Sequence, residues 1–70
     1  ESLRSLRRRL ADERNVPAYV VFSDATLREM AATKPMTDAE MLAVSGVGQK
    51  KLETYGSAFL DVIAESRGYR

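Results

Sequence analysis

The sequence predicts an all-α protein, a compact bundle of four to five short helices without a sheet. Along most of the chain, apolar residues recur at spacings of three and four, the period of an amphipathic helix. Capping patterns and prolines separate these stretches. Only residues 18–22 have the composition of a strand, and the chain offers them no second strand to pair with. Helices are therefore expected throughout.

The first helix is expected over residues 3–14. Its core-facing stripe consists of Leu3, Leu6 and Leu10. Arg4 and Arg8 fall nearly opposite this stripe, and Asp12 follows Arg8 at the i, i+4 spacing of an ion pair. The helix thus has a basic outer face. It is expected to stop before Pro17, because proline lacks the N–H donor and disfavours the helical conformation in the residue before it.

Residues 18–22 are predicted to form a buried connector, either extended or a single helical turn. The second helix follows, with Ser23 as its cap and Phe22 packed on Leu27 across the first turn. It is expected to end near Thr33, before Pro35. Its predicted buried residues are Leu27, Met30 and Ala31.

A capping box opens the third helix. The Thr37 hydroxyl and the Glu40 carboxylate are placed to satisfy two backbone N–H groups that have no partner within the helix, and Met36 and Met41 flank them as a hydrophobic staple. This short helix is expected to reach about Ser45.

A tight turn at residues 46–48 precedes the last helical stretch, which begins at Lys50. Its apolar register consists of Leu52, Tyr55, Phe59, Val62 and Ile63. Gly56 interrupts this register, so the stretch is either two helices or one kinked helix.

The composition excludes most catalytic chemistry. The chain has no cysteine and no histidine, so disulfides, thiolate or imidazole metal sites and imidazole-dependent triads are ruled out. The acidic residues lie at caps and exposed helix positions, without a paired acid and base. We therefore expect a non-catalytic domain with no cofactor or metal of its own. The longest apolar run, residues 18–22, is far too short to span a membrane.

Charge is uneven along the chain although its formal net charge is only +1. Residues 1–22 carry five arginines against three acids, residues 23–45 two cations against four acids, and residues 46–70 four cations against three acids. Any nucleic-acid binding must therefore come from a local basic patch, which forms if the first helix and the turn at residues 46–48 lie together.

Three blocks resemble the signature of HRDC domains, the helicase-and-RNase-D C-terminal module. They are residues 11–22 (ADERNVPAYVVF), 23–27 (SDATL) and 46–56 (GVGQKKLETYG), in the family's order. The last block is more similar to bacterial RecQ helicases than to ribonuclease D relatives. The resemblance covers about residues 3–63.

The resemblance implies a five-helix bundle in which residues 1–70 form one domain, a C-terminal accessory module of a larger protein. The parent would be an ATP-dependent DNA helicase whose motor, not this domain, holds ATP and magnesium. The expected partners are single-stranded or junction DNA and the helicase core in the same chain, with no membrane. The domain is expected to be a monomer in the bacterial cytoplasm, associated with the nucleoid when on DNA.

The family's tyrosine that contacts single strands falls on Tyr19. An aromatic ring stacks on any base, which suits binding that does not depend on sequence. The alternative is that Tyr19 packs in the core beside Val20, Val21 and Phe22.

The family's basic positions on the first helix fall on Arg4, Arg7 and Arg8, whose guanidinium groups suit phosphates. The alternative is an ordinary solvated helix face. Lys50 and Lys51 follow a Gly-x-Gly turn like that of helix-hairpin-helix motifs, and both are candidate phosphate contacts. For the glycines themselves, a turn that needs positive φ is the favoured explanation.

Two functions therefore compete. The first is a DNA-binding accessory domain that makes weak contacts independent of sequence and so tunes the substrate choice of the helicase. The second is a protein-interaction module that docks on the helicase core through the acidic middle segment. The acidic residues of that segment are Asp24, Glu29, Asp38 and Glu40.

Overall fold

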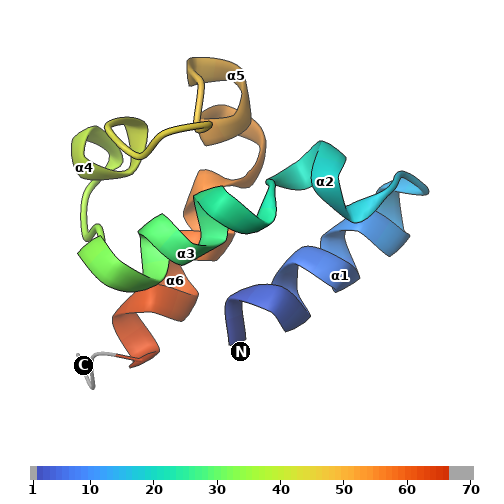
Figure 1. Ribbon diagram of the computed structural model, residues 1–70, viewed down its shortest axis with the longest axis horizontal. Coiled ribbons are helices and arrows are strands. Elements are labelled where there is room, and N and C mark those ends of the chain that lie inside the picture. The colour runs from blue at the N-terminus through green and yellow to red at the C-terminus, as the bar shows by residue number, and fades with distance from the viewer. Residues whose placement is uncertain (1, 67–70) are drawn as a thin grey trace.

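The computed structural model describes residues 2–66, which form helices and no strand (Figure 1). The elements are α1 (Ser2–Arg14), α2 (Ala18–Val21), α3 (Asp24–Thr33), α4 (Asp38–Leu42), α5 (Gln49–Lys51), the π-helical turn η1 (Leu52–Gly56) and α6 (Ser57–Ser66). Since α5, η1 and α6 follow one another without a break, the described chain forms five helical segments. The predicted all-α bundle is confirmed. Arg67 and Arg70, two cations of the last third, lie outside the described residues.

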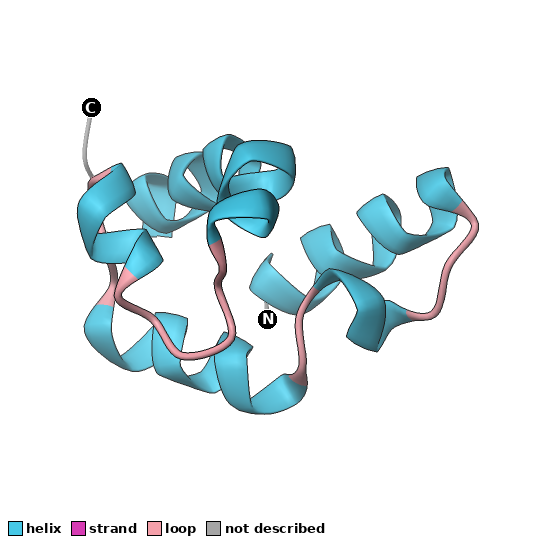
Figure 2. Cartoon of the chain, turned by 90° about the horizontal axis from the view of Figure 1, so that it is seen from above, coloured by secondary structure: helices cyan, strands magenta, loops and turns pink. Residues whose placement is uncertain are grey.

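The first helix packs against α2, α3 and α6. In Figures 1 and 2, α1 and α2 lie together at one side of the molecule, and α4 lies at the other. The core between them consists of Leu6, Ala11, Val21, Phe22, Leu27, Met30, Met41, Val44, Val47, Tyr55, Phe59 and Ile63. Leu3 and Leu10 pack on its edge, so the predicted stripe of α1 does face the core.

The end of α1 is set by Asn15, which adopts a left-handed conformation with φ of 58°. The N–H of Asn15 donates to the Asp12 carbonyl at 3.1 Å, and the N–H of Val16 donates to the Ala11 carbonyl at 3.0 Å. This is the hydrogen-bond pattern of a Schellman motif, which satisfies carbonyls that the helix leaves without partners. The helix therefore ends through its own capping motif before Pro17 is reached.

The predicted cap of α3 is confirmed, because the Ser23 Oγ accepts a hydrogen bond from the Thr26 N–H at 3.2 Å. The prediction that Ala31 is buried was wrong, since Ala31 is exposed. Thr26 is buried in addition to Leu27 and Met30. A threonine is tolerated there because its hydroxyl donates to the Ser45 carbonyl at 2.9 Å.

The Thr37 half of the predicted capping box of α4 is confirmed, whereas Glu40 accepts from the residue before the cap and not from Thr37 itself. The Thr37 Oγ1 accepts from the Glu40 N–H at 3.1 Å, and the Glu40 Oε1 accepts from the Met36 N–H at 2.8 Å. The helix ends at Leu42, however, three residues earlier than expected. Ser45 makes its hydrogen bonds with α3 instead: its N–H donates to Glu29, and its carbonyl accepts from Thr26.

Residues 49–66 form one continuous helical stretch, so the alternative of two separate helices is wrong. The irregularity expected at Gly56 is a π turn that ends at this residue. Gly56 is buried, and a Cβ built there would lie 2.6 Å from the Leu52 Cδ1. The Leu52 side chain therefore occupies the space that a larger residue at position 56 would need. No helix within residues 2–66 is long and apolar enough to cross a membrane.

Candidate nucleic-acid interface

Tyr19 lies on α2, a single helical turn that begins after Pro17. Its side chain is 72% exposed, so the alternative that Tyr19 packs in the core is wrong. Val20 beside it is 39% exposed, whereas Val21 and Phe22 are fully buried. The connector of residues 18–22 was thus predicted correctly as a single turn but wrongly as buried throughout. An exposed aromatic ring is free to stack on a base.

The buried end of α2 is anchored by aromatic contacts. The Phe22 ring meets the Phe59 ring edge to face, with 5.0 Å between centroids and 86° between planes. It meets the Tyr55 ring in a similar way at 5.9 Å and 66°. Such arrangements are favoured because the positive edge of one ring faces the negative face of the other. Phe22 therefore joins α2 to the last helix.

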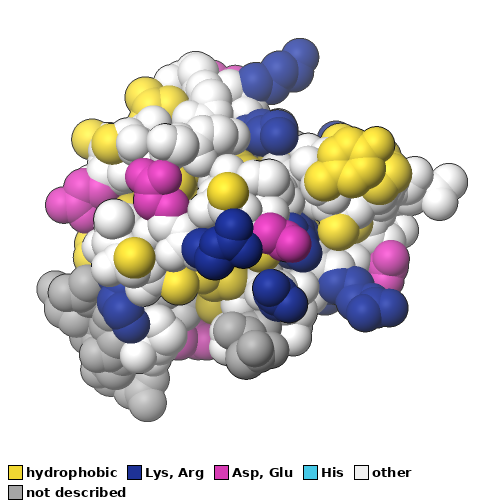
Figure 3. Space-filling view, viewed as in Figure 1, with side chains coloured by type: hydrophobic (Ala, Val, Ile, Leu, Met, Phe, Trp, Pro, Cys, Tyr) yellow, Lys and Arg dark blue, Asp and Glu magenta, His cyan; other side chains and the backbone are white. Residues whose placement is uncertain are grey.

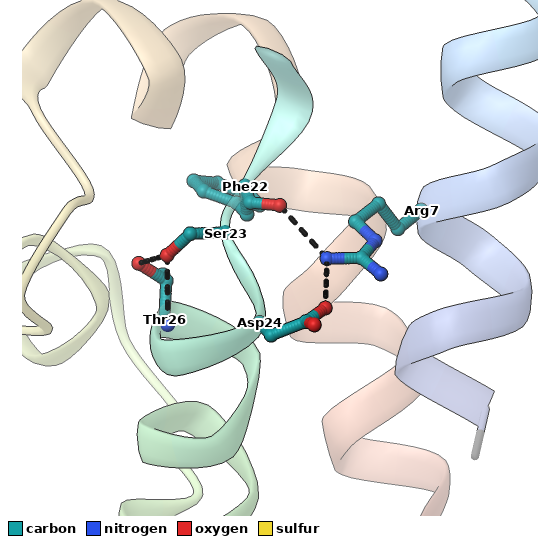
Figure 4. Close-up of polar contacts among 5 residues, drawn as sticks. All are labelled: Arg7, Phe22, Ser23, Asp24 and Thr26. Atoms are coloured by element: carbon teal, nitrogen blue, oxygen red, sulfur yellow. Dashed lines mark hydrogen bonds and ion pairs between the residues drawn. The ribbon is translucent and has the colours of Figure 1, made fainter. Parts of the chain in front are cut away.

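Arg7 on α1 joins α2 to α3, as Figure 4 shows. Its Nη1 donates to the Phe22 carbonyl at 3.0 Å and lies 2.8 Å from the Asp24 Oδ1. The Arg7 side chain is only 13% exposed. The hydrogen bond from Arg7, together with its charge, lowers the pKa of the Asp24 carboxyl. Arg7 thus makes contacts within the fold, whereas the resemblance placed it among the phosphate contacts.

Arg4 and Arg8 are exposed on α1. Together with Asp12 they line a surface hollow between α1 and α2, whose other wall includes Pro17 and Ala18. Within residues 2–66, Arg8 and Asp12 do not form the ion pair that was expected between them. The neighbouring pair forms instead, with the Arg9 Nε 3.9 Å from the Glu13 Oε2. Arg4 and Arg8 therefore remain beside the segment that carries Tyr19.

Of the two lysines, only Lys51 has a contact at the end of α2 among the described residues. The Lys51 Nζ lies 5.7 Å from the centroid of the Phe22 ring, a cation–π contact, while Lys50 is exposed at the start of α5. The α1 arginines thus lie beside α2, and Lys51 lies against its C-cap residue Phe22. Figure 3 shows hydrophobic side chains exposed over α2, with Lys and Arg side chains over α1 and near α5 on the same face.

The two glycines of the turn before α5 differ. Gly46 has φ of 89°, as a tight turn that needs positive φ requires, and a Cβ there would collide with the Thr26 hydroxyl. Gly48 has φ of −87° and is the N-cap of α5, so positive φ does not explain it. Apart from Gly48 and its two chain neighbours, no residue has an atom within 4 Å of a Cβ built at Gly48. The backbone at the start of α5 is therefore open to approach.

The acidic residues of the middle segment do not form one cluster. Asp24 pairs with Arg7, while Glu29 and Glu40 line a hollow of about 400 Å³ between α3 and α4. Asp38 is the first residue of α4 and does not line this hollow. No group of three or more acidic residues suited to a metal ion occurs within the described part of the chain.

Sequence reasoning missed the structural part played by Arg7 and Thr26. The partners of Arg7 lie 15 and 17 residues further along the chain, so no local pattern could identify them. It also missed Arg14, whose guanidinium lies 5.5 Å from the centroid of the Tyr55 ring. The one available signal was the helical wheel, which places Arg7 on the flank of the core-facing stripe of α1.

A family model described as the HRDC domain matches residues 1–63. The chain belongs to the HRDC domain family. As an HRDC domain it is an auxiliary, non-catalytic domain, and its predicted similarity to the HRDC domains of bacterial RecQ helicases is confirmed.

Relatives of this HRDC domain occur in longer helicases. It is 51% identical over 65 residues to the ATP-dependent DNA helicase RecQ of Pasteurella multocida, covering 93% of this chain and 10% of that protein. It is 49% identical over 61 residues to the ATP-dependent DNA helicase UvrD2 of Mycobacterium tuberculosis, covering 87% of this chain and 9% of that protein. The chain thus spans about one tenth of the length of these curated relatives.

A solved structure, HRDC domain 3 of RecQ from D. radiodurans, superposes on this HRDC domain with a TM-score of 0.88 and 47% sequence identity. The match covers 91% of this chain and 84% of that one. Their backbones therefore follow the same course over nearly the whole described chain.

Proposed function

We propose that this HRDC domain is an auxiliary nucleic-acid-binding domain of a RecQ-type DNA helicase. It makes weak contacts, independent of sequence, to single-stranded or branched DNA, and these contacts tune the substrate choice of the helicase. The observation that carries the proposal is the exposed ring of Tyr19 on a short helix, with Arg4 and Arg8 in the hollow beside that helix and Lys51 against its C-cap residue Phe22.

Stacking and phosphate contacts have separate roles in this proposal. Tyr19 stacks on a base, which contributes affinity without reading sequence. Arg4, Arg8, Lys50 and Lys51 pair with phosphates along the strand. Arg7 is left out of this set because its Nη1 already contacts two oxygen atoms of the protein.

The parent protein in this proposal is an ATP-dependent DNA helicase, like the RecQ relatives that the chain resembles. ATP and magnesium are bound by its motor, and this domain, residues 1–70, acts in the same chain as a monomeric C-terminal module. The bacterial cytoplasm, at the nucleoid, is the proposed location. These statements rest on similarity to proteins about ten times longer than this chain.

A second function, docking on the helicase core, is favoured by one observation. Glu29 and Glu40 line the same hollow, together with Lys34 and the apolar side chains of Met36 and Val44, so acidic side chains outnumber basic ones in its lining. A basic segment with an apolar anchor would complement that lining. This function requires no contact between the domain and DNA.

Salt dependence separates the two functions. We expect a fluorescent oligothymidylate titrated with the chain to bind more weakly as salt rises, with a log–log slope of about −2.8, or −0.7 for each of four phosphate contacts. The control is a Glu29→Gln, Glu40→Gln double variant, which should bind at least as well. If no binding appears at low salt, DNA binding is refuted and docking is favoured.

A further inference from the structure

We infer that Arg7 and Asp24 are positioning residues, which hold α2 in the orientation that presents Tyr19 to nucleic acid. This inference rests on the proposed function and deepens it. Neither residue is assigned a contact with DNA. Their effect on binding passes through the backbone at the junction of α2 and α3.

The short helix needs support from outside itself. It has four residues, and a helix this short is not stable alone, because few hydrogen bonds offset the cost of forming the first turn. The Phe22 N–H donates to the Ala18 carbonyl at 3.4 Å, and the Val20 N–H donates to the Pro17 carbonyl at 3.0 Å. The direction of the turn must therefore be fixed by tertiary contacts.

The Arg7 guanidinium supplies such a contact at the point where α2 ends. The Phe22 carbonyl belongs to the C-cap of α2, and the Asp24 carboxylate belongs to the first residue of α3. One nitrogen of Arg7 bridges these two oxygens (Figure 4). A cation near a helix C-terminus and an anion near a helix N-terminus are each favourable to the helix dipole. The bridge thus fixes both helices at their junction.

The aromatic contacts of Phe22 do not replace this bridge. They fix the Phe22 ring against the last helix, whereas Arg7 fixes the Phe22 carbonyl against α1. Tyr19 projects from the same turn, three residues before Phe22. A change in the orientation of the turn would therefore move the Tyr19 ring relative to Arg4 and Arg8.

Removal of Asp24 is a useful test, because an isolated acidic charge and a positioning residue predict opposite changes in DNA affinity. The Asp24 side chain is 56% exposed, so as an isolated charge it would repel phosphates, and its loss would strengthen DNA binding. As a positioning residue, its loss weakens binding. Asp12 is the matched control, because it is an exposed acid beside Arg4 and Arg8 that forms no ion pair with either of them.

The experiment measures the affinity of the chain for fluorescent oligothymidylate in a double-mutant cycle. We expect Asp24→Ala to weaken binding by about threefold or more, and to cause no further loss when Tyr19→Ala is already present. Asp12→Ala should leave binding unchanged or strengthen it. Arg7→Lys keeps the charge but shortens the side chain, so it serves as the second variant if Asp24→Ala unfolds. It should also weaken binding only when Tyr19 is present, without changing the salt slope.

The outcomes distinguish this inference from the proposed function. If Tyr19→Ala weakens binding but Asp24→Ala and Arg7→Lys do not, the inference is wrong and the proposed function stands. An equal loss with and without Tyr19 would indicate a general effect on folding and would also overturn the inference. If the chain does not bind DNA, or if Tyr19→Ala has no effect on binding, the inference and the proposed function are both wrong.

Discussion

Tyr19 and Phe22 lie three residues apart around one helical turn and face opposite environments, the first ring in solvent and the second fully buried between Tyr55 and Phe59. The buried ring anchors the turn that carries the exposed one. This arrangement keeps the Tyr19 side chain at the surface while the backbone that carries it is held in place. A ring held in this way loses less conformational entropy when it stacks on a base.

Replacement of Tyr19 should affect binding but not folding. We expect Tyr19→Ala to weaken the affinity for single-stranded DNA by about 1–3 kcal/mol, the usual contribution of one stacked base. Tyr19→Phe should retain most of the affinity, because the ring remains. The free energy of unfolding should change by less than about 0.5 kcal/mol, because the side chain is exposed. Fluorescence anisotropy and thermal melts check these expectations, and an affinity equal to wild type would show that the ring does not stack.

Two arginines of α1 should contact phosphate and a third should not. Arg4→Gln and Arg8→Gln should each reduce the magnitude of the salt slope by about 0.7. Arg9→Gln is the control with the same loss of charge, because Arg9 pairs with Glu13 and lines a different hollow, beside Ser5 and Val62. If all three variants lower the slope equally, binding reflects net charge and not a defined surface.

The two glycines before α5 should respond differently to alanine. Gly46→Ala should cost about 2–3 kcal/mol, since alanine is strained at positive φ and its Cβ would displace the Thr26 hydroxyl from the Ser45 carbonyl. Gly48→Ala should cost less than about 1 kcal/mol, because the site is open and only the capping preference is lost. Chemical denaturation measures both values. Equal costs would contradict the turn geometry.

The ion pair of Asp24 should make stability depend on pH in the acid range. Its pKa is lowered below the ordinary 3.8, first by the hydrogen bond from Arg7 and then by the charges of Arg7, Arg4 and Arg28, while burial opposes the shift. A carboxylate with a lowered folded-state pKa stabilises the fold fully above its unfolded pKa, and this contribution is lost as the pH falls through the folded pKa. The pair should therefore stabilise the protein at neutral pH.

Denaturation of wild type and Asp24→Asn across pH checks this expectation. The difference in free energy of unfolding should be constant above roughly pH 5 and should shrink as the pH falls below about 3.8. A difference that stays constant down to about pH 3 would show that the charge of Asp24 contributes nothing to stability.

The sequence predicted those parts of the fold that depend on local signals. The caps at Ser23 and Thr37 are set by residues within one turn, and both are found where they were expected. The end of α4 depends on Ser45, whose backbone groups contact Glu29 and Thr26 on α3. Those contacts join residues 16 and 19 positions apart, so no local pattern could have predicted them.

The candidate site was less predictable than the fold for a related reason. A helical wheel places Arg4 and Arg8 opposite the core, and the structure finds both exposed. For Tyr19 the sequence left two alternatives open, because residues 18–22 are too short and too apolar to show which side faces solvent. Only the packing of Val21 and Phe22 in the core determines that Tyr19 points outward.

The most direct test of the account is an NMR titration of the ¹⁵N-labelled chain with oligothymidylate. The account predicts that amide shifts change around Tyr19 on α2, near Arg4 and Arg8, and near Lys50 and Lys51. Shifts confined to the hollow that Glu29 and Glu40 line, or no shifts at low salt, would contradict it.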